Sequence, residues 1–434
     1  MSARAVLVVA HLPKASPRIP GLARYLPACG WRPVVVTPCS AAGGEEPTVR
    51  TIETPHRPVL GVLKSALGAD PHDGLRVQLT NRLPLDAKGS LLDRLLGVAA
   101  EVVNYPDADK HWRPVALAVI EDLLRREDIK AVISSSPPVT AHVIAGELKA
   151  RYGLPWVADL RDLWSQNHNY GYGSIRRHFD LRLERKTLAT ADALVTVSGP
   201  WAERLRGLHT SKVVHAITNG FDPAYVNGGE VELPARFTIT YTGSIHRPMQ
   251  DPWSFFIALR ALIDDGTIDP DRLDVRFHTA PAAWLDKQIR EAGLERVVRQ
   301  PGIVPYRTAL RLQQASHALL LLNWEDLKEK GCYPLKIFEY LAAKRPILAI
   351  GGSAADVVTQ LLRETQAGVS CLDIDAVKTC LAEMYRKYIA SRTVRYYGID
   401  QRILKYGYDA MAGQFATILT ALTAKTVTRC VSAS

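Results

Sequence analysis

The sequence predicts an α/β protein made of two doubly wound, Rossmann-like domains, each with a parallel sheet at its centre. Short apolar segments of strand length alternate with longer amphipathic segments along most of the chain, and this alternation occurs in two successive sets. Such a pattern is typical of βα units that form a parallel sheet with helices on both faces. The length of 434 residues also exceeds one typical domain and suits two or three.

The elements of both halves follow from their apolar runs. In the first half we expect buried strands at residues 5–10, 32–37, 131–134, 156–158, 193–197 and 213–217, with amphipathic helices at 114–126 and 139–151. In the second half we expect strands at residues 237–241, 274–278, 297–300, 318–322, 346–349 and 368–372. Sheets of this kind bind ligands beyond the carboxyl ends of their strands, so we expect the two domains to face a cleft.

A segment rich in Gly, Pro and acidic residues, 219–234, is the natural linker between the halves. We therefore expect a first domain at 1–225, a second domain at 235–395, C-terminal helices at 396–423 with the last one at about 407–422, and a frayed polar tail at 424–434.

Composition narrows the class of protein. Hydrophobic residues make up 47% of the chain and charged residues 23%, as in ordinary soluble domains, and no run reaches the ~18 apolar residues of a membrane helix. The short apolar run at the N-terminus leads into a loop with Pro and Arg, which argues against a signal peptide. The six cysteines are scattered without a Cys-x-x-Cys pair, which indicates free thiols and a cytoplasmic location.

The net charge of +10 indicates attraction to an anionic partner. A nucleoside diphosphate, an anionic membrane surface and nucleic acid would each fit. Nucleic acid ranks last, because no basic run with interleaved aromatic residues is present.

The most informative segment is 333–351, Tyr-Pro-Leu-Lys-Ile-Phe-Glu-Tyr-Leu-Ala-Ala-Lys-Arg-Pro-Ile-Leu-Ala-Ile-Gly. Pro334 suits the first position of a helix, so the amides of Leu335 and Lys336 would face outward as an anion site, reinforced by the lysine charge. Glu339, one turn deeper, could accept hydrogen bonds from a pair of hydroxyls. Diphosphate at the helix tip and a diol beyond it outline a nucleotide-sugar site; the alternative is an ordinary αβ unit with a solvated Lys and Glu.

This segment resembles the donor-binding helix of GT-B glycosyltransferases, in particular the large retaining family numbered four. In that family a Glu at the position of Glu339 holds the donor ribose. Many members carry another Glu eight residues earlier, where this chain has Gly331. A subgroup with the pattern Pro-x-Lys-x-x-Glu-Tyr-Leu-Ala also lacks that acid, and the chain is similar to this subgroup.

Further segments carry the resemblance, in order, from about residue 5 to about residue 350. Residues 13–21 resemble the acceptor-side loop after the first strand, and they do not form the Gly-x-Gly-x-x-Gly turn of a dinucleotide dehydrogenase. Residues 134–138, 154–164, 191–198 and 218–222 resemble the strand ends of the family's first domain. The resemblance also implies that the last helix crosses back onto the first domain.

The implied activity is transfer of a sugar, with retention, from a nucleoside diphosphate donor to a glycan or lipid-linked acceptor in surface polysaccharide or glycoconjugate synthesis. No metal or other cofactor is expected, since no Asp-x-Asp pair suits a diphosphate-bound cation. The implied donor-binding residues are Gly243, Arg247, Leu335, Lys336 and Glu339; the implied acceptor-binding residues are His11, Arg18 and Gly21. Arg247 is preferred to His246, because a guanidinium can hold phosphate oxygens in a bidentate manner.

Arg161 and Asp162 occupy the strand end where many relatives carry a catalytic His, and they are the candidate catalytic residues. Asp162 could steer the acceptor hydroxyl or stabilise positive charge on the sugar, whereas Arg161 cannot act as a base near neutral pH. A structural pair that fixes the loop is the alternative.

Three wider alternatives stay open. One is a non-catalytic GT-B subunit that binds nucleotide-sugar, and another is a nucleotide-sugar 2-epimerase. The third concerns residues 60–106, where Ser90 and Asp93 begin an apolar helix that either packs on the first domain or contacts the inner face of the cell membrane as a peripheral association.

Overall fold

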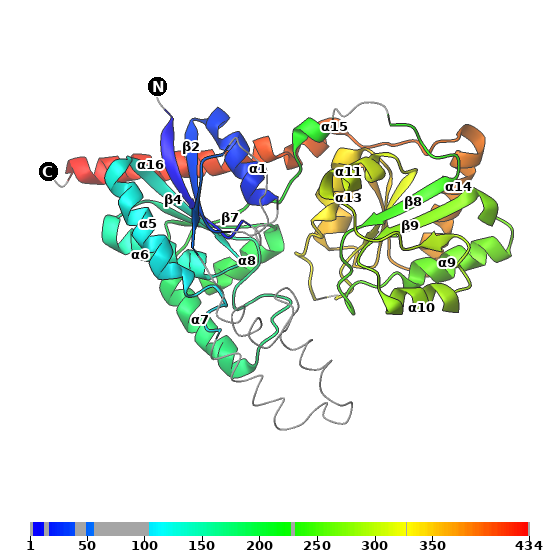
Figure 1. The fold of residues 1–434 in the computed structure, drawn as a ribbon, viewed down its shortest axis with the longest axis horizontal. Helices are drawn as coiled ribbons and strands as arrows, with labels where there is room; N and C mark the ends of the chain where they lie inside the picture. Colours follow the sequence, from blue (N-terminus) through cyan, green and yellow to red (C-terminus); the bar gives the residue numbers. More distant parts are fainter. Residues whose placement is uncertain are drawn as a thin grey trace. The chain divides into compact units, whose positions relative to one another are not determined.

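The computed structural model describes residues 3–12, 17–39, 49–55, 104–226, 231–326 and 328–432. The chain divides into two compact units (Figure 1). The first unit comprises Met1–Ile217 and Ala412–Ser434, and the second comprises Thr218–Met411. The first unit therefore ends at Ile217, before the expected domain end at residue 225. The segment 396–423 was expected to hold separate C-terminal helices. Its residues up to Met411 belong to the second unit, and the rest belong to the first.

A seven-stranded sheet forms the centre of the first unit, with the order β3-β2-β1-β4-β5-β6-β7 and every neighbouring pair parallel. Its strands are β1 (Arg4–Val9), β2 (Trp31–Pro38), β3 (Thr51–Thr54), β4 (Ile129–Ser136), β5 (Trp156–Leu160), β6 (Ala193–Thr196) and β7 (Val214–Ala216). The winding reverses between β1 and β4, so the sheet is doubly wound, as predicted. The edge strand β3 was not predicted, because its residues, Thr-Ile-Glu-Thr, are mostly polar and exposed.

The helices of the first unit are α1 (Arg18–Tyr25), η1 (Leu26–Cys29), α5 (Trp112–Arg126), α6 (Thr140–Tyr152), α7 (Ser174–Leu188) and α8 (Gly199–Leu208). One prediction was wrong here: residues Arg18 to Gly21 were expected in a loop, but they form the first turns of α1. Pro17 and Pro20 suggested a loop, yet proline is tolerated in the first turn of a helix, where its missing N–H costs no hydrogen bond.

The last helix, α16 (Tyr408–Ser432; red in Figure 1), packs on the first unit. The hydroxyl of Thr420 accepts hydrogen bonds from Arg4 at 3.2 Å and from the indole of Trp31 at 3.3 Å. Phe415 and Leu419 on the same helix are fully buried. The helix continues to Ser432, whereas a frayed tail was expected from residue 424. A helix already held by packing propagates at little cost, even through polar residues.

The second unit contains a six-stranded parallel sheet with the order β10-β9-β8-β11-β12-β13. Its strands are β8 (Phe237–Thr242), β9 (Leu273–His278), β10 (Val298–Arg299), β11 (Ala318–Leu322), β12 (Ile347–Ile350) and β13 (Gly368–Cys371). The winding reverses between β8 and β11, which repeats the plan of the first unit. Both sheets confirm the predicted class of two doubly wound parallel α/β domains.

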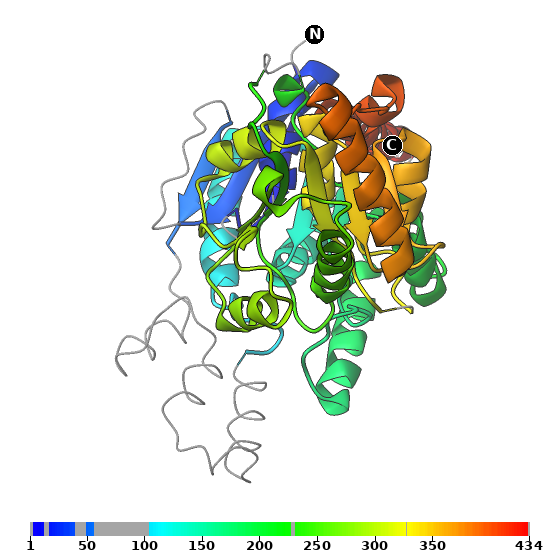
Figure 2. The same ribbon diagram turned by 90° about the vertical axis from the view of Figure 1, so that its right-hand side faces the viewer.

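The helices of the second unit are η3 (Pro223–Tyr225), α9 (Trp253–Asp264), η4 (Pro270–Arg272), α10 (Ala283–Glu291), α11 (Tyr306–Gln314), α12 (Lys336–Ala343), α13 (Val357–Thr365), α14 (Ile374–Ser391), α15 (Asp400–Ile403) and η5 (Leu404–Tyr406). Alternate residues of β11 enter two different cores. Leu320 packs with α9, α10 and α14, whereas Leu319 packs with α12 and α13. Helices therefore cover both faces of the sheet; α14 (orange) lies in front of it in Figure 2.

The chain enters and leaves the second unit through two paired segments. Phe221 donates its amide to the carbonyl of Tyr406 at 3.1 Å, and the amide of Tyr408 donates to the carbonyl of Phe221 at 2.9 Å. A Cβ atom at Gly220 would overlap the carbonyl oxygen of Tyr406, so the two segments approach closely only because this residue is glycine. We call this paired region the clasp.

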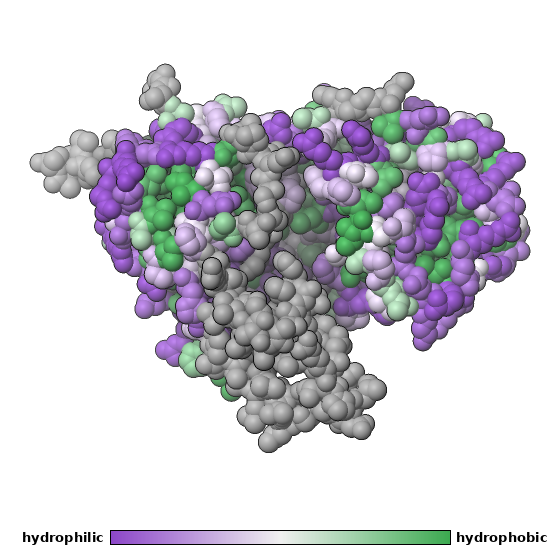
Figure 3. All heavy atoms as spheres, in the orientation of Figure 1, coloured by the Kyte–Doolittle hydropathy of each residue, from purple (hydrophilic) through white to green (hydrophobic). Residues whose placement is uncertain are grey.

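Some predictions fall outside the described residues. The apolar helix expected from Ser90 and Asp93, with the membrane contact considered for it, lies there, as does part of the linker at 227–230. Among the helices that the structure describes, none combines the length and the hydropathy needed to cross a bilayer. Hydrophilic side chains cover much of the surface drawn in Figure 3, with hydrophobic residues scattered between them.

Candidate functional site

The candidate site of the second unit lies where strands β8 and β11 end, at the point where the winding of the sheet reverses. Open α/β sheets bind their ligands at this position. Gly243 directly follows β8 and has a φ of +94°, a conformation that side chains rarely adopt. A Cβ on Gly243 would lie 3.4 Å from Cε of Lys336, so the glycine brings the backbone of this loop close to the lysine.

Helix α12 supplies the two charged residues of the site. It begins at Lys336 with Leu335 as its N-cap, so Pro334 precedes the cap and does not occupy the first helical position that was predicted for it. The amides of Ile337 and Phe338 bond to the carbonyls of Pro334 at 3.0 Å and Leu335 at 3.2 Å. The side chain of Leu335 is exposed at the helix tip.

The ammonium group of Lys336 is held against the loop that follows β8. Its Nζ donates to the carbonyl of Ser244 at 3.2 Å and lies 5.0 Å from the centre of the Tyr241 ring. The hydroxyl of Tyr241 donates to the same carbonyl at 2.7 Å. Burial lowers the pKa of Lys336 to about 8, and the nearby Glu339 partly opposes this shift. The charge of this lysine is therefore poorly solvated, and an anion would stabilise it.

Glu339 is held by a residue that the sequence analysis missed. Nε2 of the buried Gln313, on α11, donates to Oε2 of Glu339 at 3.0 Å and to the hydroxyl of Thr242 at 2.9 Å. Burial raises the pKa of Glu339, while Gln313 and Lys336 lower it. The available signal was a glutamine on the apolar face of an amphipathic helix, since a buried amide needs partners.

An apolar rim adjoins this pair of charges. It is formed by Tyr306 and Leu335, two exposed large hydrophobic residues of the second unit. Burial and the charge of Glu339 raise the pKa of Tyr306, which indicates that its ring lies near that carboxylate. Such a rim could pack against the flat apolar face of a base.

Arg247, the other predicted phosphate ligand, is occupied elsewhere. Its guanidinium donates to Asp251 at 3.2 Å and lies 4.6 Å from the centre of the Trp284 ring. Asp251 is also held by Gln288 at 3.0 Å. The structure therefore brings Gly243, Leu335, Lys336 and Glu339 together, but ties Arg247 to a neighbouring carboxylate.

In the first unit, the predicted acceptor residues are largely internal. Arg18 is fully buried and forms a bidentate ion pair with Asp159, at 2.8 and 3.1 Å, and Ser135 donates to the same carboxylate at 2.8 Å. Gly21 is buried inside α1. His11 is buried, with Nε2 at 3.8 Å from Asp109. Arg18 and Gly21 thus support the interior of the unit, because their helix begins earlier than expected.

The candidate catalytic residues directly follow β5. Arg161 donates to the carbonyl of Pro137 at 2.9 Å, which fixes the loop after β4. Burial raises the pKa of Asp162, although Arg161 and His168 oppose the shift. The nearby His142 is fully buried, and its Nδ1 shares a hydrogen bond with the hydroxyl of Ser134 at 2.8 Å. Burial lowers the pKa of His142 to about 4. It is therefore a neutral packing residue at physiological pH.

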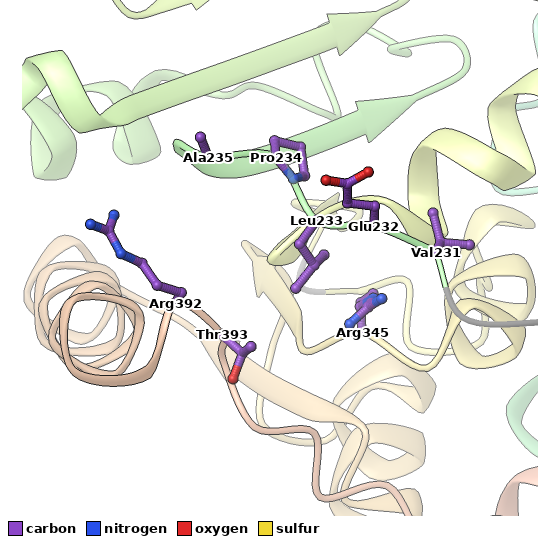
Figure 4. A pocket seen from close by; sticks show the side chains of 8 residues that line it. All are labelled: Val231, Glu232, Leu233, Pro234, Ala235, Arg345, Arg392 and Thr393. Carbon is purple, nitrogen blue, oxygen red and sulfur yellow. The ribbon is translucent and has the colours of Figure 1, made fainter.

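A groove of about 830 Å³ lies elsewhere on the second unit. Figure 4 shows that its lining comes from residues 231–235, before β8, from Arg345, before β12, and from Arg392 and Thr393, after α14. These residues lie at the amino ends of the strands, the edge opposite to Lys336 and Glu339. Among the residues that the structure describes, no group of three or more His, Cys, Asp or Glu side chains is arranged to hold a metal ion.

Part of the chain matches a known protein family. Residues 15–220 match the family described as glycosyl transferase 4-like domain. The subgroup motif at 333–351 lies outside that match and stays a prediction. No curated protein matches the chain.

Three solved structures resemble the chain over nearly its whole length. Sucrose-phosphate synthase from Thermosynechococcus elongatus has 13% identity and a TM-score of 0.64, with 97% of this chain and 100% of that chain covered. The UDP-forming α,α-trehalose-phosphate synthase from Burkholderia xenovorans has 12% identity, a TM-score of 0.64, and coverage of 96% and 100%. A glycosyltransferase from Rickettsia africae has 12% identity, a TM-score of 0.61, and coverage of 97% and 99%. The two parallel-sheet units and these likenesses show that the chain has the GT-B fold.

Proposed function

We propose that the chain is a retaining glycosyltransferase that takes a sugar from a nucleoside diphosphate donor. The observation that carries the proposal is the joint placement of Lys336 and Glu339 on one turn of α12, at the carboxyl edge of the second sheet. Diphosphate would bind at the helix tip, near the amides of Leu335 and Lys336. The carboxylate of Glu339 would accept hydrogen bonds from the ribose hydroxyls.

The reaction requires stabilisation of negative charge on the departing diphosphate. The poorly solvated ammonium of Lys336 and the amino end of α12 would supply it, and Gly243 lets the β8 loop approach the phosphates. Arg247 would join them only by leaving Asp251, so we assign it a secondary role. The similarity of residues 15–220 to a glycosyl transferase 4-like domain supports the same reaction class. The acceptor would be a glycan or glycolipid of surface polysaccharide or glycoconjugate synthesis.

Calorimetric titration tests the donor site. UDP, GDP, ADP, CMP and dTDP are titrated into the whole chain with EDTA and then with magnesium. We expect one diphosphate to bind without added metal, and binding to weaken by about 1–3 kcal/mol in Glu339→Gln, which loses a charge-assisted hydrogen bond. Lys336→Met should weaken it too, whereas Lys344→Met, at the other end of the same helix, should not.

Four further outcomes would decide between the reactions. Anomeric NMR of the product should show retention of configuration. Binding of nucleotide-sugar without transfer to any offered acceptor would instead favour a non-catalytic subunit, and turnover of donor alone would favour an epimerase. Absence of binding by all five nucleotides would remove the donor site.

A further inference from the structure

A pocket of about 190 Å³ lies in the first unit, at the carboxyl ends of β4 and β5. Its described lining comes from Pro106 and Asp107, from the end of β4 and the loop after it, from several residues between 162 and 172 after β5, and from Asp180 on α7. We propose that this pocket binds one uncharged sugar ring of the acceptor. The assignment of the sugar as acceptor rests on the proposed function, whereas the binding of a sugar ring does not.

Unsatisfied polar atoms in buried residues are the first support. Ser136 and Asp180 are each only 2% exposed, and both line the pocket. The hydroxyl of Ser136 and Oδ1 of Asp180 have no hydrogen-bond partner among the residues that the structure describes. Buried polar atoms are rarely left without partners, because the lost hydration costs about 1–3 kcal/mol. Hydroxyl groups of a ligand would supply these missing bonds.

Asp107, another of the three carboxylates in the lining, provides a contrast. Both oxygens of Asp107 are already used: one accepts from the amide of Thr140 at 2.7 Å, and the other accepts from the hydroxyl of Thr140 at 2.7 Å and the amide of Asp109 at 2.8 Å. Asp107 therefore supports the start of α6. The unfilled hydrogen-bonding capacity belongs to Ser136 and Asp180, on the walls of the pocket.

Aromatic rings form the second part of the lining. Trp164, Tyr170 and Tyr172 all line the pocket, and the two tyrosine rings meet edge to face at 5.6 Å. Arg177 lies 4.6 Å from the centre of the Tyr170 ring, and Arg176 lies 4.7 Å from that of Tyr172. These contacts hold the rings in place before a ligand arrives. A sugar ring presents C–H groups on its faces and hydroxyls around its edge, and so it matches a lining of aromatic faces and polar atoms.

Charge and size define the ligand more narrowly. The described lining includes Asp107, Asp162 and Asp180 but no Lys, Arg or His. Arg176 is not part of the lining; it donates to the carboxylate of Asp180 at 3.0 Å and to the carbonyl of Pro106 at 2.6 Å. An anion such as a sugar phosphate would face three carboxylates of the described lining and no cation within it. The volume is also below the range of about 300–1,000 Å³ that drug-sized ligands occupy, which fits a single ring.

The experiment uses saturation-transfer NMR on the whole chain, without nucleotide. The probes are methyl glycosides of glucose, galactose, mannose and N-acetylglucosamine, with methyl glucuronide as an acidic control. We expect at least one neutral glycoside to bind, and Tyr172→Ala and Asp162→Asn to weaken it about tenfold or more. Tyr152→Ala is the matched control, because Tyr152 is 46% exposed and Tyr172 is 45% exposed in the same unit, yet Tyr152 lies outside the pocket.

Three results would overturn the proposal: no neutral glycoside binds, the glucuronide binds as well as the neutral probes, or the two tyrosine variants behave alike. Thermal unfolding of Tyr172→Ala serves as the folding check, and the transition of the first unit should stay at the wild-type temperature. Glycoside binding without any nucleotide binding would leave the pocket in place and would remove only the proposed transferase function.

Discussion

Gln313 donates a hydrogen bond to Glu339 at 3.0 Å, and the same amide nitrogen lies 2.9 Å from the hydroxyl oxygen of Thr242. The carboxylate proposed to hold the ribose is therefore fixed from behind by a buried side chain of another helix. This arrangement leaves less rotational freedom to be lost when a ligand binds.

Replacing Gln313 should therefore weaken nucleotide binding although the residue need not touch the nucleotide. We expect Gln313→Leu to reduce the affinity about tenfold, which corresponds to about 1.4 kcal/mol. Calorimetry measures the change, and Gln314→Leu is the control, since Gln314 bonds the carbonyl of Tyr225 instead. Equal effects of the two substitutions would contradict a specific role of Gln313.

Nucleotide affinity should depend on the protonation of Lys336. Its pKa is lowered to about 8, so the ammonium loses its proton as the pH rises through that value, and affinity for a diphosphate should fall above it. Titrations from pH 6 to pH 10 measure this. Lys336→Arg is the control, because a guanidinium stays charged throughout, and its affinity should not fall in this window.

The lowered pKa of Lys336 also affects the stability of the fold. The pKa is about 8 in the folded chain and 10.5 ordinarily, so between these pH values the unfolded chain binds more protons at Lys336. Its contribution to the free energy of unfolding therefore rises with pH across this window. Urea unfolding of wild type and Lys336→Met at several pH values should show that difference; a difference that falls with pH would argue against a lowered pKa.

Removing half of the buried Arg18–Asp159 pair should strongly destabilise the first unit. Both side chains are fully buried, so Arg18→Ala leaves an unpaired internal carboxylate, and we expect a loss of about 3–5 kcal/mol in the free energy of unfolding. Arg113→Ala breaks the exposed pair with Glu147 and should cost at most about 1 kcal/mol. Denaturant unfolding measures both; a small loss in Arg18→Ala would show that water reaches Asp159.

Helix α16 should contribute to the stability of the first unit. Phe415 is fully buried and lies beneath the Arg18 guanidinium, at 5.4 Å. We expect Phe415→Ala to lower the free energy of unfolding by about 3–5 kcal/mol. Ile389→Ala, at an exposed position of α14, should change it by less than about 0.5 kcal/mol. Calorimetry should show the shift in the transition of the first unit.

Two glycine substitutions should act in opposite directions. A methyl group at Gly220 would overlap the carbonyl of Tyr406 in the clasp, so Gly220→Ala should destabilise by about 1–3 kcal/mol. A Cβ at Gly413, inside α16, meets nothing within 4 Å, and Gly413→Ala should stabilise by about 0.5–1 kcal/mol. Thermal unfolding of both variants provides the test, and destabilisation of similar size in both would refute the steric explanation.

The strands and their class were predictable because buried parallel strands are continuous apolar runs. The run at Ala318–Leu322, for example, is entirely buried, and it is too short for a typical helix. The polar edge strand Thr51–Thr54 lacked this signal. The start of helix α1 was placed too late, near Leu22, because two prolines look the same in a loop and in a first helical turn.

The site was most predictable where one local segment carries it. Lys336 and Glu339 share a helix, so their spacing alone places them together. Gln313 is 26 residues from Glu339, and no local pattern connects the two. Arg18 and Asp159 are 141 residues apart, so an arginine that looked accessible in sequence proved to have a distant internal partner.

The position of α16 also bears on how the chain is made. The first unit contains both the earliest and the latest residues of the sequence, and the second unit lies entirely between them. On the ribosome, the second unit is therefore complete before the first, whose surface around Trp31 and Arg18 stays uncovered until the final helix emerges. A chain that terminates early would release a finished second unit attached to an unfinished neighbour with exposed apolar surface. Quality control that recognises such surface would remove these fragments.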